Sequence, residues 1–268
     1  LDLLLVIVFK MSVAGVAIAT VVAQYISCIL TVRATFRSIE NINFDRRIFN
    51  LNVHKTMQLI KIGIPAGLQN VVFAVANLFI QAGVNSFDAL MVAGNAATMN
   101  GDNLVYNIMA AFYTAGATFI GQNYGAHKKS RILKSYFIST GYAFLVGITF
   151  GIILYVFGHQ FLGLFTTDST VVDYAMKKFR IMTFSFGISA FMDGAIAANR
   201  GLGKTFVPSI FVFIGSCFFR IIWIYTIFAH FRTIESLFLL YPASWFITAI
   251  FETVYFISTY RKETKELL

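Results

Sequence analysis

Residues 181–199 read IMTFSFGISAFMDGAIAAN, a stretch in which Asp193 is the only charged side chain. A run of about 20 mostly apolar residues is long enough to cross a bilayer as a helix. A charge inside such a run is costly and is usually retained for a task. Asp102, Arg220 and Glu252 also lie inside apolar stretches. These four positions predict a pathway for an ion or a polar solute through a membrane.

The composition agrees with a membrane protein. Hydrophobic residues make up 58% of the 268 residues, and charged residues only 12%. Soluble domains carry about 25% charged residues, so a water-soluble domain is excluded. Apolar stretches of spanning length give seven complete spans, preceded at residues 1–9 by the end of another. The sequence therefore predicts an all-α fold, a polytopic bundle of membrane helices, with Asp168 as the N-cap of the helix over 170–200.

The positive charges predict how the spans are oriented. The net charge is +9, and the basic residues concentrate in the connections between spans. If the sides alternate, fifteen Lys and Arg residues fall on one face and five on the other: Lys10, Lys177, Lys178, Arg180 and Arg232. The positive-inside rule then places the first face and the C-terminus in the cytoplasm, with the protein in the cell membrane. Because orientation explains the charge, nucleic acid is not an expected partner.

Polar side chains form stripes on two of the expected helices. Asn70, Asn77 and Gln81 are spaced by seven and four residues, which places them on one helical face. A similar stripe runs along the span over 89–122. Such stripes either join helices by hydrogen bonds or line a water-accessible cavity for a polar or cationic solute. The candidate lining residues are Gln69, Asn70, Asn77, Gln81, Asn103, Tyr106, Asn107 and Ser189.

The acidic residues are candidates for coupling transport to an ion. Ser185, Ser189 and Asp193 step by four, so the carboxylate shares a face with two hydroxyls. Asp193 is a candidate to bind and release a cation, to pair with Arg220, or to do both. Asp102 is the second ion candidate, or else a group that hydrates an outer vestibule. Glu252 is expected to reach toward the cytoplasmic headgroups.

Enzymatic signatures are missing from the chain. Residues 198–205 fit a loose phosphate-loop pattern, but they join two membrane helices rather than a strand and a helix, so nucleotide binding is not expected. Cys28 and Cys217 lie in different spans and indicate neither a disulfide nor a metal site. We therefore expect no enzyme, no metal and no bound cofactor.

Several short motifs together resemble one transporter family. They are Gly63-Ile-Pro-Ala-Gly-Leu-Gln69, Gly121-Gln-Asn-Tyr-Gly-Ala126, Asn199-Arg-Gly-Leu-Gly-Lys-Thr205 with Pro208, and Tyr241-Pro-Ala-Ser-Trp245. With Gly15–Thr20 and Arg220 they resemble the multidrug and toxic compound extrusion (MATE) transporters. Many members carry an acid two turns after the Gly-x-Pro, where this chain has Val72-Phe73-Ala74. Asp193 falls where other members carry a Glu.

The resemblance implies a domain organisation. Family members have two six-helix bundles around a cavity that opens alternately to each side. Residues 1–36 then correspond to the end of the N-terminal lobe, about one and a half spans. Residues 37–58 correspond to a cytoplasmic linker with an amphipathic stretch, 59–260 to the C-terminal six-helix lobe, and 261–268 to a cytoplasmic tail. Because Leu1 lies in an apolar run without the features of a signal peptide, we expect the chain to be an N-terminally truncated fragment.

The resulting hypothesis is an antiporter that exports small organic cations or drugs in exchange for Na⁺ or H⁺. Its expected partners are a small-molecule solute and the bilayer, and the full-length protein is expected to be a monomer. The alternative is a lipid-linked oligosaccharide flippase of similar architecture. It would need a strongly cationic cavity, whereas Arg220 is the only basic group expected at depth. A membrane-embedded enzyme would need clustered His or paired carboxylates near one interface, which the sequence lacks, and a scaffold would not need polar stripes.

Overall fold

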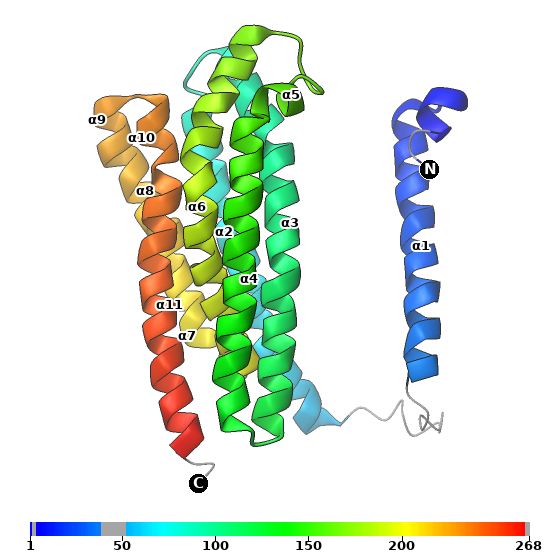
Figure 1. Cartoon of the computed structure of the whole chain (residues 1–268), viewed down its shortest axis with the longest axis vertical. Helices are drawn as coiled ribbons and strands as arrows, with labels where there is room; N and C mark the ends of the chain where they lie inside the picture. Colours follow the sequence, from blue (N-terminus) through cyan, green and yellow to red (C-terminus); the bar gives the residue numbers. More distant parts are fainter. Residues whose placement is uncertain (2–3, 39–51, 266–268) are drawn as a thin grey trace. The chain divides into compact units, whose positions relative to one another are not determined.

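The computed structural model describes residues 1, 4–38 and 52–265, and they form two units, Leu1–Val53 and His54–Leu268 (Figure 1). Most of the expected linker over 37–58, including Arg46 and Arg47, lies outside the described residues, as do residues 266–268 of the tail. Within the described part every regular element is helical. The all-α prediction is therefore confirmed, whereas the domain boundaries stay a prediction.

The first unit is a single candidate span. A short π-helix, η1 (Leu4–Val8), precedes α1 (Ser12–Ser38). Apolar side chains such as Val13, Tyr25 and Ile29 are exposed on α1. A helix that is apolar on all sides suits a lipid environment.

The second unit contains the other six candidate spans. Its long helices are α2 (Val53–Val84), α3 (Ala89–Gly125), α4 (Lys129–Val156), α6 (Ser169–Gly201) and α11 (Leu240–Lys265), with short α5 (Gly158–Leu162) and α10 (Ile234–Phe238) at turns. The remaining span, Phe206–Phe231, alternates α7 (Phe206–Val212), η3 (Phe213–Phe218), α8 (Phe219–Trp223), η4 (Ile224–Phe228) and α9 (Ala229–Phe231). With α1, seven described helices are long and apolar enough to cross a membrane, as predicted.

Side-chain caps fix where two of these helices begin. Asp88 precedes α3, and its Oδ1 accepts a hydrogen bond from the backbone N–H of Met91 at 2.8 Å. Asp168 precedes α6 and accepts from the N–H of Thr170 at 2.8 Å. Such caps satisfy N–H groups that have no partner inside the helix. The predicted cap at Asp168 is confirmed.

Helix α6 forms the centre of the lobe. In its most apolar window 78% of the residues are buried, against 11% for α2. Small residues bring its neighbours close: a Cβ added at Gly151 of α4 would lie 2.7 Å from the carbonyl oxygen of Thr183 on α6. Close backbone approach at small residues is a common way for membrane helices to pack. The large side chains Met109, Phe179 and Phe186 fill the core beside them.

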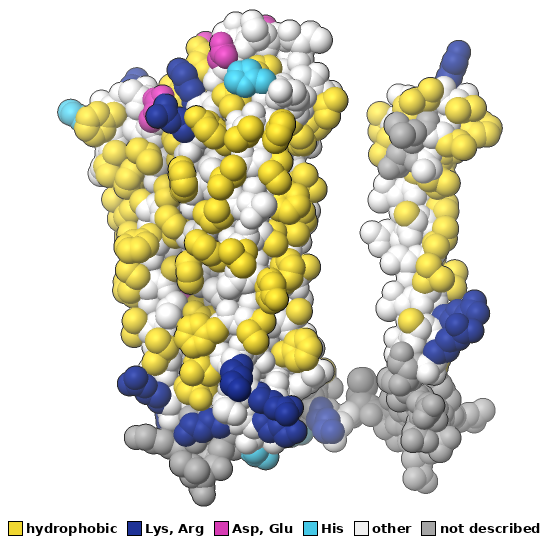
Figure 2. All heavy atoms as spheres, viewed as in Figure 1, with side chains coloured by type: hydrophobic (Ala, Val, Ile, Leu, Met, Phe, Trp, Pro, Cys, Tyr) yellow, Lys and Arg dark blue, Asp and Glu magenta, His cyan; other side chains and the backbone are white. Residues whose placement is uncertain are grey.

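The surface of the second unit has the character of a membrane protein. Figure 2 shows a broad belt of apolar side chains, with Lys and Arg gathered at the end where the C-terminus lies. Lys128, Lys129, Arg131 and Lys134, at and after the turn between α3 and α4, belong to that end. The opposite end, near α5, carries Asp, Glu and His side chains as well.

Candidate functional site

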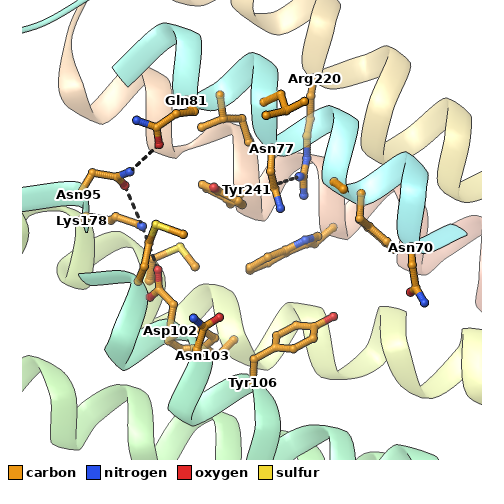
Figure 3. A pocket seen from close by; sticks show the side chains of 18 residues that line it. Asn70, Asn77, Gln81, Asn95, Asp102, Asn103, Tyr106, Lys178, Arg220 and Tyr241 are labelled. Carbon is orange, nitrogen blue, oxygen red and sulfur yellow. Dashed lines mark hydrogen bonds and ion pairs between the residues drawn. The ribbon is translucent and has the colours of Figure 1, made fainter. Parts of the chain in front are cut away.

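A cavity of about 560 Å³ lies in the lobe between α2, α3, α6, α8 and α11 (Figure 3). Seven of the predicted site residues line it: Asn70, Asn77, Gln81, Asp102, Asn103, Tyr106 and Arg220. The cavity is further lined by Phe73, Ala74, Leu78, Ile80, Asn95, Met99, Lys178, Met182, Phe186, Tyr241 and Trp245. The wall therefore combines amides, aromatic rings and three charged groups.

The α2 stripe both lines the cavity and joins helices. Asn77 Oδ1 accepts a hydrogen bond from Arg220 Nη1 at 3.2 Å. Gln81 Oε1 accepts from Asn95 Nδ2 on α3 at 3.2 Å. The two interpretations offered by the sequence are thus compatible, because one face of α2 serves both purposes.

Asp102 forms an ion pair with a lysine that the sequence analysis counted on the less basic face. Lys178 Nζ lies 2.8 Å from Asp102 Oδ2 and donates to Asn95 Oδ1 at 3.0 Å. Lys178 is only 3% exposed, so its assignment to the outer basic group was wrong. The sequence contains a signal for this burial. Lys178 shares one face of α6 with Ser185, Ser189 and Asp193, at spacings of seven, four and four residues.

Asp193 lies behind the cavity wall rather than in it. Its side chain is buried, with the residue 7% exposed, and Oδ2 accepts a hydrogen bond from the hydroxyl of Tyr106 at 2.9 Å. Tyr106 itself lines the cavity, and its ring packs edge-on against Tyr113. The Tyr106 hydroxyl therefore links the cavity to the buried carboxylate.

The predicted ion pair between Asp193 and Arg220 is not formed. Arg220 Nε instead donates to Ser244 Oγ at 3.0 Å, in addition to the bond to Asn77. Depth explains the difference. Asp193 lies eight residues before the end of α6 at Gly201, whereas Arg220 lies fourteen residues into the next span. At 1.5 Å per residue these positions are roughly 12 and 21 Å from the same end of the lobe.

Three further predicted lining residues do not reach the cavity. Gln69 is buried and accepts a hydrogen bond from Arg200 Nη2 at 3.1 Å. Ser189 is buried and donates to the carbonyl of Phe186 at 2.9 Å. Asn107 is exposed and does not line the cavity. Gln69 and Ser189 thus act within the helix packing.

Glu252 is the most buried carboxylate of the described residues. It is 0% exposed, and its Oε2 accepts from Asn199 Nδ2 at 2.9 Å. The expectation that it reaches toward the headgroups was wrong, because Glu252 points to Asn199 on α6 where α11 packs against Ala195 and Ala198. Glu252 Oε1 and Asn199 Oδ1 have no hydrogen-bond partner in the described structure.

The MatE family model matches residues 65–226, more than half of the chain. The chain belongs to the MatE family. Members of this family are transporters and not enzymes. The match runs from Pro65 within α2 to Thr226, just after α8, and so includes most of the helices that wall the cavity.

Curated relatives of this MatE chain carry names that concern drug export. A probable multidrug resistance protein NorM from Thermotoga maritima is 24% identical over 215 residues, covering 76% of this chain and 44% of the relative. The multidrug export protein MepA of Staphylococcus aureus is 22% identical over 211 residues, covering 76% of this chain and 46% of the relative. The chain spans less than half the length of these relatives.

Solved structures share the fold. A mutant of the Vibrio cholerae MATE transporter VcmN superposes with a TM-score of 0.79 at 20% identity, covering 98% of this chain and 59% of that one. A MOP superfamily transporter from Pyrococcus furiosus gives a TM-score of 0.87 at 16% identity, with 98% and 60% coverage. The bundle of membrane helices is therefore that of known MATE transporters.

Proposed function

We propose that this MatE chain forms the C-terminal lobe of an antiporter. The antiporter exports small organic solutes, drugs among them, in exchange for Na⁺ or H⁺ by alternating access. The observation that carries the proposal is a cavity walled by amides, aromatic rings and three charged groups, with the carboxylate of Asp193 hydrogen-bonded to one of its wall residues. Ionisable groups at membrane depth are characteristic of such pathways.

The hydrogen bond from Tyr106 to Asp193 suggests how cation and solute compete. A Na⁺ or H⁺ on Asp193 weakens the acceptor that holds the Tyr106 hydroxyl. Tyr106 is then released to turn within the cavity that it lines. The solute binds the cavity while Tyr106 is still hydrogen-bonded to Asp193. The cation and the solute therefore favour different states of the transporter. Exchange follows from that competition. The C-terminus and the basic end of the lobe lie in the cytoplasm, by the positive-inside rule.

The solutes that the family resemblance implies are organic cations. A flippase for lipid-linked oligosaccharides is the alternative, and it would hold a pyrophosphate with several basic groups. Besides Arg220, Lys178 is a second buried basic residue, but Asp102 neutralises its charge, with 2.8 Å between Lys178 Nζ and Asp102 Oδ2. A single uncompensated charge suits a small solute better than a pyrophosphate.

The test uses the full-length protein that contains this chain, reconstituted in vesicles. Asp193→Asn should abolish export of a fluorescent drug driven by an ion gradient, while membrane insertion is retained. Asp173→Asn on the same helix is the matched control, because Asp173 is exposed and does not line the cavity. Applying a pH gradient or a sodium gradient alone identifies the ion. Export by Asp193→Asn at the wild-type rate would contradict the proposal.

A further inference from the structure

Arg220 is a buried cation that has no counter-ion among the residues that the structure describes. It lies on α8, is 1% exposed and lines the cavity. Its described partners are all neutral: the Ser244 hydroxyl, the Asn77 amide and the ring of Tyr241, whose centre is 5.1 Å from the guanidinium carbon. A buried charge that lacks an opposite charge is costly, so an anion arriving at this place is stabilised.

The other cation of the same cavity provides the contrast. Lys178 has its carboxylate, Asp102, at 2.8 Å. Figure 3 shows this pair at one side of the cavity and Arg220, with Asn77, at the other. The lining thus carries two basic groups and one acid, and the charge left over belongs to Arg220.

The geometry of Arg220 leaves donors for a ligand. A guanidinium has five N–H groups. One on Nε and one on Nη1 are used by Ser244 and Asn77, which hold the plane of the group in place. The other three have no acceptor among the described residues. Such a fork matches the two oxygens of a carboxylate.

We propose that Arg220 binds the carboxylate of an aromatic acid, whose ring packs against Tyr241 and Trp245. The proposal rests on the proposed exporter and names its solute class, which differs from the organic cations that the sequence predicts. Asn77 and Ser244 are positioning residues, since they orient the guanidinium. Aromatic side chains are plentiful in the wall: Phe73, Tyr106, Phe186, Tyr241 and Trp245.

The experiment compares three probes of nearly equal shape and different charge. Indole-3-acetate is an anion, indole-3-acetamide is neutral and tryptamine is a cation. Their dissociation constants are measured by calorimetry on the purified full-length protein. We expect the acetate to bind about tenfold or more tighter than the amide, the scale expected for a buried charge pair. Since this comparison needs no variant, it stays decisive if a substitution of Arg220 prevents folding.

Variants then assign the preference to Arg220. Arg220→Gln should remove the preference for the acetate, and Arg220→Lys should keep only part of it, since an ammonium has the charge without the fork. Arg180→Gln is the control, because Arg180 is exposed and lies outside the cavity. Melting temperatures show whether each variant is folded.

The outcomes separate this proposal from the exporter itself. Tighter binding of tryptamine than of the acetate overturns the anion subsite, while ion-driven export of a cationic dye would leave the exporter standing. Equal binding of acetate and amide, failure of all three probes to bind, or an unchanged preference in a folded Arg220→Gln variant also overturns it.

Discussion

Glu252 and Asn199 each keep one oxygen without a partner, although both side chains are buried. An unpaired buried acceptor costs about 1–3 kcal/mol. Asn199 Nδ2 donates to Glu252 Oε2 at 2.9 Å and to the Glu252 backbone carbonyl at 3.2 Å, so the two oxygens that remain unpaired are both acceptors. The pair lacks a hydrogen-bond donor for these oxygens.

A substitution can supply that donor. Glu252→Gln keeps an acceptor for Asn199 Nδ2, adds an N–H for Asn199 Oδ1 and removes a buried carboxylate. We expect it to raise the apparent melting temperature of the full-length protein in detergent at neutral pH. Glu252→Ala should lower stability by about 2–5 kcal/mol, because it leaves a cavity and the Asn199 amide unpaired. If the Gln variant melts as early as the Ala variant, the carboxylate itself is required.

Among the elements, α6 depends on glycine at its contacts with α4. Thr183 Oγ1 on α6 donates to the carbonyl of Gly151 on α4 at 3.2 Å, which shows how closely the backbones approach. No side chain could be placed between them without moving one helix. The same helix α4 also carries Gly141, around which an added Cβ would meet nothing within 4 Å.

This difference gives a matched pair of substitutions. Gly151→Ala places a Cβ 2.7 Å from the Thr183 carbonyl oxygen and 3.1 Å from its Cα. Because both are backbone atoms, we expect a loss of about 1–3 kcal/mol. Gly141→Ala should be neutral or slightly stabilising, since alanine favours the helix. Thermal unfolding of the two variants side by side measures the effect, and equal melting temperatures would show that the contact at Gly151 is not tight.

The spans themselves were predictable from the sequence because length and apolarity determine them. The side-chain partners within the site were not predictable, because they depend on how each helix is rotated about its axis and on the depth of each residue in the bundle. The sequence predicted α6 and its cap at Asp168. It did not predict that Asp193 and Arg220 lie at different depths in the bundle and therefore do not pair. Lys178 was misplaced for a related reason: it was counted with Lys177 and Arg180 on the outer face, although it lies on a buried face of the helix. Tyr241 and Trp245 line the cavity because of the position of α11 in the bundle, which the sequence pattern does not reveal.

For the whole molecule, the charge asymmetry predicts orientation more strongly than the sequence count suggested. Burial of Lys178 leaves four basic residues on the outer face, Lys10, Lys177, Arg180 and Arg232, against fifteen on the other. Since the positive-inside rule concerns charges in the loops, a buried and paired lysine does not count.

Single cysteines test this orientation in intact cells. Cys28, Cys217 and every cysteine of the full-length protein outside this chain are first replaced by serine. A membrane-impermeant maleimide should label Thr167→Cys, between α5 and α6, without permeabilisation. Lys128→Cys, before α4, should be labelled only after the cells are opened. Both sites are exposed, so accessibility differs by side alone. The reverse pattern would place the basic end outside.

The contrast between α2 and α6 bears on how such a lobe diversifies. Much of the cavity wall comes from α2, few of whose residues are buried, while most of the tight packing comes from α6. If the cavity binds a solute as proposed, substitutions that change recognition and substitutions that impair folding are expected on different helices. Exchange of the amides of α2 would then alter the solute without disturbing the packing around α6.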